Sequence, residues 1–231
     1  MSLWLIRSLV AVCCLGFLWA GAVQAQQTII NAPSPDVLNP GEWSIGTGHY
    51  FRPWHTSSNP GGFFNLSVTY GLPRLDFGDI EVGINANYFD YRHLTQSAAF
   101  ADLGFKWRPR YRVTIGGKAD FSLLVGNTAG IGISGHTEGK VRDMVYTSVV
   151  MRNHGTGTRI STGPYYATRN VFDSSPRIGA QVTFEQPVLA PIYGLTLVTD
   201  WQSGKGAYLT PGLMWTKDNF SAGIGYGLAN T

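Results

Sequence analysis

Alternation of apolar and polar residues constrains the fold of this chain more than any other feature of its sequence. In the segment DIEVGINANYFDY (79–91), Ile80 and Val82 fall on one face of an extended chain, whereas Glu81 and Asn85 fall on the other. A period of two over this length is typical of a β-strand with one apolar and one polar face. No segment after residue 41 shows convincing 3.6-residue periodicity, so the pattern predicts an all-β fold.

The alternation recurs in runs that are separated by turn signals and by two longer connections, 52–62 and 126–140. Pro164 and Pro211 fall within runs, where each removes a ladder hydrogen bond, so they predict bulges or shifted boundaries. An even strand number is expected when both termini lie in the periplasm, and the segment 127–135 is a candidate twelfth strand. We therefore predict ten to twelve strands, from runs at 42–51, 63–70, 79–91, 98–107, 111–126, 141–152, 158–168, 177–185, 194–202, 206–216 and 220–229.

The first 25 residues have the pattern of a cleaved signal peptide. Arg7 supplies a positive charge, Leu9–Val23 is apolar, and Ala25 ends a short cleavage motif of small residues. The apolar stretch is shorter than the roughly 18 residues of a membrane-spanning helix. The pattern predicts export, a periplasmic N-terminal segment at 26–41 and a barrel at 42–231.

Composition excludes several functions. Both cysteines, Cys13 and Cys14, lie within the predicted signal peptide, so the rest of the chain has no disulfide, thiolate metal site or cysteine nucleophile. The net charge of +3 is too small to argue for binding to nucleic acid or to an anionic membrane surface. The five histidines have no metal-ligand spacing. We expect no cofactor and no metal.

The polar faces of the runs predict a confined, wet interior. They are rich in Gly, Ser, Thr and Asn, and their few charges are of mixed sign, whereas long Lys and Glu side chains would dominate a solvent-facing sheet. The polar faces therefore indicate a barrel lumen, although a soluble exported β-sandwich or barrel stays an alternative. The predicted lumen-lining residues are Glu81, Asn85, Asn87, Asp102, Lys106, Lys118, Asp120 and Asp200.

The apolar faces end in aromatic residues, as expected where a membrane barrel meets the two lipid–water interfaces. They predict that the apolar face looks outward to lipid, which makes the chain a single antiparallel transmembrane β-barrel. The predicted girdle residues are Tyr70, Tyr88, Trp107, Trp201, Trp215 and Phe220.

This layout resembles bacterial outer-membrane β-barrel proteins, and NAPSPDVLNPGEW (Asn31–Trp43) is similar to the N-terminal signature of an uncharacterised, porin-like family of small barrels. The resemblance implies Sec-type export, cleavage near Ala25, and insertion into outer-membrane lipid. The chain departs from the pattern at its end, where Leu228-Ala229-Asn230-Thr231 stands in place of a terminal aromatic residue.

The leading functional hypothesis is a small passive channel for polar solutes, with the charged lumen row setting its selectivity. The same row could instead form a plug of salt bridges, in a non-conducting structural or interaction barrel whose loops at 52–62 and 126–140 bind a partner. A third hypothesis is a lipid-modifying enzyme that uses His49 with Ser44, or His93 with Ser97. No motif favours either pair, so we expect no enzymatic activity.

Overall fold

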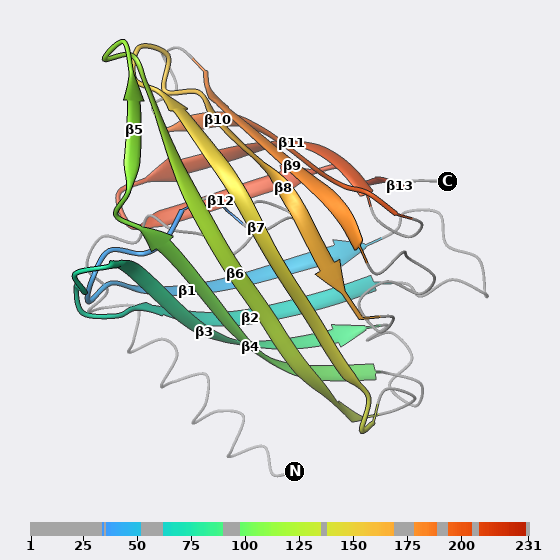
Figure 1. The fold of residues 1–231 in the computed structure, drawn as a ribbon. Helices are drawn as coiled ribbons and strands as arrows, with labels where there is room; N and C mark the ends of the chain where they lie inside the picture. The colour runs from blue at the N-terminus through green and yellow to red at the C-terminus, as the bar shows by residue number, and fades with distance from the viewer. Residues whose placement is uncertain are drawn as a thin grey trace.

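The computed structural model describes residues 34, 36–51, 62–89, 98–134, 138–168, 178–188, 194–204 and 208–229. These residues form one antiparallel sheet (Figure 1), which confirms the predicted all-β antiparallel class. None of them forms a helix long and apolar enough to cross a membrane. The strands are β1 (Trp43–Phe51), β2 (Gly62–Gly71), β3 (Gly78–Phe89), β4 (Ala98–Pro109), β5 (Arg112–Ile115), β6 (Ala119–Ser134), β7 (Val141–Asn153), β8 (Arg159–Ala167), β9 (Ile178–Pro187), β10 (Leu195–Gln202), β11 (Tyr208–Lys217), β12 (Phe220–Gly225) and β13 (Leu228–Ala229).

Eleven strands form a continuous path from β1 to β12, and each strand pairs with the next along it. The short strands β5 and β13 lie off this path, paired with β6 and β11. The sheet curls around an interior (Figure 1), but in the described part of the chain no backbone pairing joins β1 to β12. The expected barrel closure is therefore not observed. Because ten antiparallel steps separate β1 from β12, the two run in the same direction and cannot form an antiparallel ladder with each other.

The segment 111–134 differs from the sequence prediction. The run 111–126 is a hairpin, because Gly116 and Gly117 turn the chain between β5 and β6 with φ of 57° and 67°. The segment 127–135 is not a further strand, since Asn127–Ser134 continues the 16-residue β6. The glycines of β6 concealed this continuity.

Both strand prolines coincide with interruptions of a ladder. The pairing of β7 with β8 skips the residues between Tyr146↔Tyr165 and Val149↔Thr162, where Pro164 lies. Pro211 lies on β11 opposite the gap that separates β12 from β13. The strands therefore persist through both prolines, with the missing donors placed at breaks.

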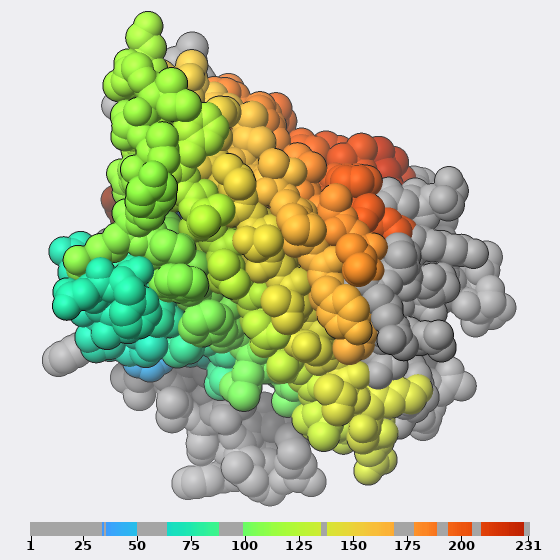
Figure 2. Space-filling model, in the orientation of Figure 1, coloured from blue at the N-terminus to red at the C-terminus, as the bar shows by residue number. Residues whose placement is uncertain are grey.

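The two faces of the sheet differ sharply. On the inner face lie buried polar and charged residues, among them Glu81, Lys106 and Asp200. On the outer face lie exposed large apolar residues such as Ile84 and Leu103. Figure 2 shows the outer side chains of β6, β7 and β8 as a continuous wall.

A tyrosine packs over a glycine on the inner face. A Cβ built on Gly126 would lie 2.1 Å from Cζ of the cross-strand residue Tyr146, whose side chain is buried. We therefore predict that Gly126→Ala lowers the free energy of unfolding by about 1–3 kcal/mol, because the rigid ring has to move. Urea unfolding measures this loss. In a Tyr146→Ala background the same substitution should cost much less, and an equal loss in both backgrounds would contradict the packing.

Candidate functional site: the charged interior and its N-terminal strap

Residues Asp36–Leu38, which we call the strap, lie inside the curl of the sheet. The Leu38 backbone N–H donates to Glu81 Oε2 at 2.9 Å, and the Lys106 ammonium donates to the Asp36 carbonyl at 3.1 Å. These contacts hold the strap to β3 and β4.

The Asp36 carboxylate contacts strands further along the path. It forms ion pairs with Arg152 of β7, at 3.3 Å, and with Arg159 of β8. Val37 belongs to a buried apolar cluster with residues from β6, β7 and β8, including Leu124 and Tyr165. The strap therefore lies against the inner face of the sheet along the arc from β3 to β8.

Glu81 and Lys106 form a buried ion pair beneath the strap. They are cross-strand partners on β3 and β4, their charged atoms lie 3.1 Å apart, and their side chains are only 2% and 4% exposed. Glu81 accepts a hydrogen bond from the strap while Lys106 donates one. Each charged group thus also forms a hydrogen bond with the backbone of the strap. These hydrogen bonds offset part of the cost of burying two charges.

A second charged network lies further along the same two strands. Asp102 pairs with Arg142 of β7, accepts a hydrogen bond from Asn87, and so joins β3, β4 and β7. The Arg142 guanidinium also lies over the Phe100 ring, 4.3 Å from its centroid. This network places a carboxylate and a guanidinium in the interior.

A third network lies where β8 begins. Arg159 pairs with both Glu185 of β9 and Asp36 of the strap. Arg159 and Glu185 line a cavity of about 300 Å³, together with Arg152, Gly157, Pro187 and Thr196. The strap is therefore anchored beside an accessible part of the interior.

The structure brings most of the predicted lumen residues to one face. Glu81, Asn87, Asp102, Lys106, Asp120 and Asp200 are buried, and Asn85 lies half-buried beside them on β3. Lys118 is a correction: it is exposed in the glycine turn before β6, because the strand that was expected to carry it starts only at Ala119.

The predicted girdle residues lie toward the two ends of the outer face. Tyr70, Trp107, Trp215 and Phe220 lie toward the end where β1 begins, and Trp201 lies toward the opposite end. Tyr70 contacts Trp43, and Trp215 contacts Phe220, with ring centroids 4.5 and 5.9 Å apart. The side chain of Tyr88 lies outside the described residues.

The sequence prediction missed the strap and the arginines that hold it. The sequence predicts that Asp36 belongs to a periplasmic segment that precedes the barrel, whereas Asp36 lies inside the curl and contacts Arg152 and Arg159. The alternation of β8 and β9 could have placed Arg159 and Glu185 on one face. Nothing in the sequence marks Asp36 as their partner.

Of the two enzyme candidates, the pair Ser44 and His49 does not assemble. Ser44 and His49 lie an odd number of residues apart on β1, so their side chains point to opposite faces of the sheet. His93 and Ser97 lie outside the described residues, as does the predicted signal peptide. Within the described ranges there is no group of His, Cys, Asp and Glu residues that could hold a metal ion.

The β5–β6 hairpin extends the sheet beyond the outer aromatic residues. Trp107 pairs with Val125, so Asp120 lies five residues further along β6, outside the level of Trp107. Its pKa lies below the ordinary value of a carboxyl, chiefly because the Thr114 hydroxyl and His154 donate hydrogen bonds to it. Arg112 pairs with the same carboxylate at 3.1 Å.

Comparison of the chain with protein-family models, curated proteins and solved structures found no match.

Proposed function

We propose that the chain is a bacterial outer-membrane β-barrel that conducts small polar solutes, and that the strap closes it in the conformation described. The observation that carries the proposal is the inverted distribution of polarity between the two faces of the sheet. The inner face buries Glu81, Asp102 and Lys106, whereas large apolar residues such as Leu103 (67% exposed) cover the outer face. An exposed apolar surface of this size marks a contact with a partner. A lipid bilayer suits an apolar surface that runs around the outside of a curled sheet.

Strand length supports the same placement. Nine of the eleven strands on the path have 8 to 13 residues. A tilted strand crosses a bilayer with about 9–11 residues. Aromatic side chains near both ends of the outer face suit the two interfaces.

Lipid placement adds one requirement at the edges of the sheet. Backbone groups on the free edges of β1 and β12 cannot stay unpaired in hydrocarbon. Because the two strands run in the same direction, they can pair with each other only as parallel neighbours, as in membrane barrels with an odd number of strands.

Planar-bilayer recording of the refolded protein tests the proposal, after heat-dependent gel mobility has confirmed folding. We predict brief, discrete openings whose ion selectivity depends on charge at Thr196, which lines the interior cavity. Thr196→Lys should shift the reversal potential toward anions and Thr196→Glu toward cations, because fixed charge in a narrow pore sets selectivity.

Thr156, in the exposed turn between β7 and β8, is the matched control position. Thr156→Lys and Thr156→Glu should leave the reversal potential unchanged. If the reversal potential is the same in Thr196→Lys, Thr196→Glu and wild type, the current does not pass through the interior.

The alternative of a non-conducting structural barrel has one specific observation in its favour, which is that the strap is held by polar contacts to β3, β4, β7 and β8. A folded protein that stays silent even after the strap is weakened would support this alternative. The two expected partner-binding loops do not help it, since 52–61 lies outside the described residues and 127–134 is strand.

A further inference from the structure

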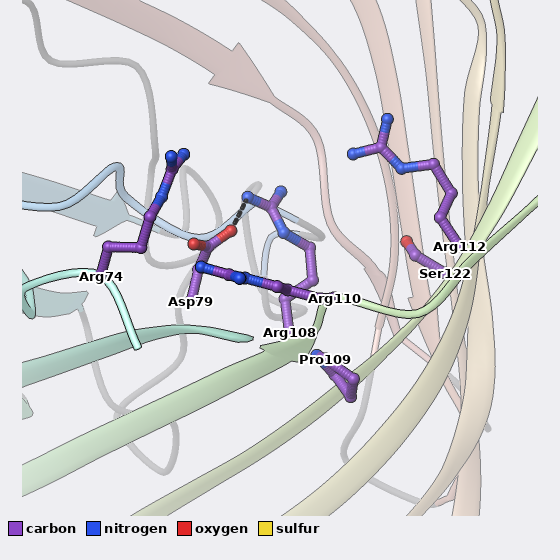
Figure 3. Close-up of a pocket in the computed structure, with 7 residues that line it drawn as sticks. All are labelled: Arg74, Asp79, Arg108, Pro109, Arg110, Arg112 and Ser122. Carbon is purple, nitrogen blue, oxygen red and sulfur yellow. Dashed lines mark hydrogen bonds and ion pairs between the residues drawn. The ribbon is translucent and has the colours of Figure 1, made fainter. Parts of the chain in front are cut away.

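Four arginines gather around one cavity at the end of the sheet where β1 begins. Figure 3 shows Arg74, Arg108, Arg110 and Arg112 around it, with Asp79 beside Arg108. Pro109 and Ser122 complete the lining of a cavity of about 190 Å³. Arg74 comes from the β2–β3 connection, whereas the other three come from β4, β5 and the residues between them.

Positive charge at this cavity is only partly compensated. Arg108 pairs with Asp79 at 2.9 Å, and Arg112 pairs with Asp120, which also binds Thr114 and His154. The lining therefore has four guanidinium groups and one carboxylate.

Arg74 and Arg110 are the least compensated members of the set. Arg110 lies 4.0 Å from Asp76, a fully exposed residue, and such surface pairs contribute little. Arg74 has no ion pair within the part of the chain that is described. Two guanidinium groups are thus available to an anion.

The chemistry of the cavity fits a phosphate group. A guanidinium presents parallel N–H donors that match two phosphate oxygens, and several converging on one site favour a phosphate ester over a monovalent halide. Ser122 adds a hydroxyl to the same lining.

The cavity lies at the rim of the sheet, at the level of an outer tryptophan. Trp107 faces outward, where its ring lies 6.3 Å from that of the exposed Phe77, whereas the next residue, Arg108, faces inward and pairs with Asp79. Tryptophan on an outer face marks the level of lipid headgroups, so the cavity lies at that level but opens on the inner face of the sheet.

We propose that Arg74, Arg108, Arg110 and Arg112 form a binding site for the phosphate group of an anionic ligand, supplied either by a phospholipid headgroup or by a soluble phosphate. The site does not depend on conduction, so a silent barrel would leave the proposal intact.

The test compares the folded wild-type chain with the double variant Arg74→Gln/Arg110→Gln. These two arginines hold no buried carboxylate, so their removal leaves the fold unaffected, and gel mobility verifies this. The control is Lys140→Gln/Lys217→Gln, which removes two exposed positive charges elsewhere on the chain. Binding is measured in detergent by native mass spectrometry with phosphatidylglycerol or diacylglycerol, and by calorimetry with inorganic phosphate.

We expect wild type and control to bind phosphatidylglycerol and not diacylglycerol, and the arginine variant to bind at least about tenfold more weakly. Binding of inorganic phosphate with the same dependence on Arg74 and Arg110 would assign a soluble source, and binding of the lipid alone would assign the headgroup. Equal affinity in wild type and arginine variant, or an equal loss in the lysine control, would overturn the site.

Discussion

Replacing Glu81 by alanine should lower the free energy of unfolding by about 3–5 kcal/mol, because it leaves a buried ammonium without its counter-charge. The Lys106 side chain is only 4% exposed and lies 3.1 Å from the Glu81 carboxylate. The side chain of Lys106 is therefore almost inaccessible to solvent in this conformation. The substitution also removes the acceptor of the Leu38 backbone N–H. Denaturant unfolding of the refolded protein in detergent measures the loss.

Two further variants identify the cause of that loss. Glu42→Ala removes an exposed carboxylate whose hydrogen bonds within the described residues go to Asn39, and it should cost less than about 1 kcal/mol. Glu81→Ala combined with Lys106→Met removes both charges, and it should be more stable than Glu81→Ala alone. A double variant no more stable than the single one would show that the pair is not coupled.

Side-chain alternation predicted the fold class because it is a local property of each strand. In β3 and β4 polar and apolar side chains alternate along each strand, so the sequence alone places Glu81 and Lys106 on the polar face. The register that places these two side chains opposite each other depends on the turn between the strands. Alternation does not specify that register.

The glycines of β6, the longest strand, are the reason that its full length was not predicted. Along β6, Gly126 and Gly130 lie on the inner face, where a Cβ would collide with Tyr146 and with Asp102. Their lack of a side chain is a consequence of bulky groups on neighbouring strands. Read alone, the same glycines indicate a loop, so packing between strands overrode the local signal.

The strap lay beyond sequence reasoning for a different reason. Asp36 binds Arg152 and Arg159, which follow it in the sequence by more than a hundred residues. Nothing local distinguishes a segment that lies inside the curl from one that precedes the sheet. The contacts of the strap therefore emerge only from the assembled structure, and they change the leading hypothesis from an open channel to one that we propose is closed by its own N-terminal segment.

If the proposed function is right, neutralising Asp36 should open the channel. Asp36→Asn keeps the size of the side chain but removes the charge that pairs with Arg152 and Arg159. Hydrogen bonds to charged groups contribute about 1.5–3 kcal/mol each, so weakening them should raise the open fraction about ten- to a hundredfold. Arg159 keeps its pair with Glu185, so the wall of the barrel stays intact while the strap is released.

Single-channel recording measures the change as open probability at fixed voltage. Glu42→Gln is the matched control, since it removes one carboxylate just outside the interior and should gate like wild type. High salt should raise the open probability of the wild type and hardly affect Asp36→Asn, because screening acts on the ion pairs that the variant has lost. If Asp36→Asn folds and gates like wild type, the strap does not close the channel. If both stay silent, the charged interior is a structural plug.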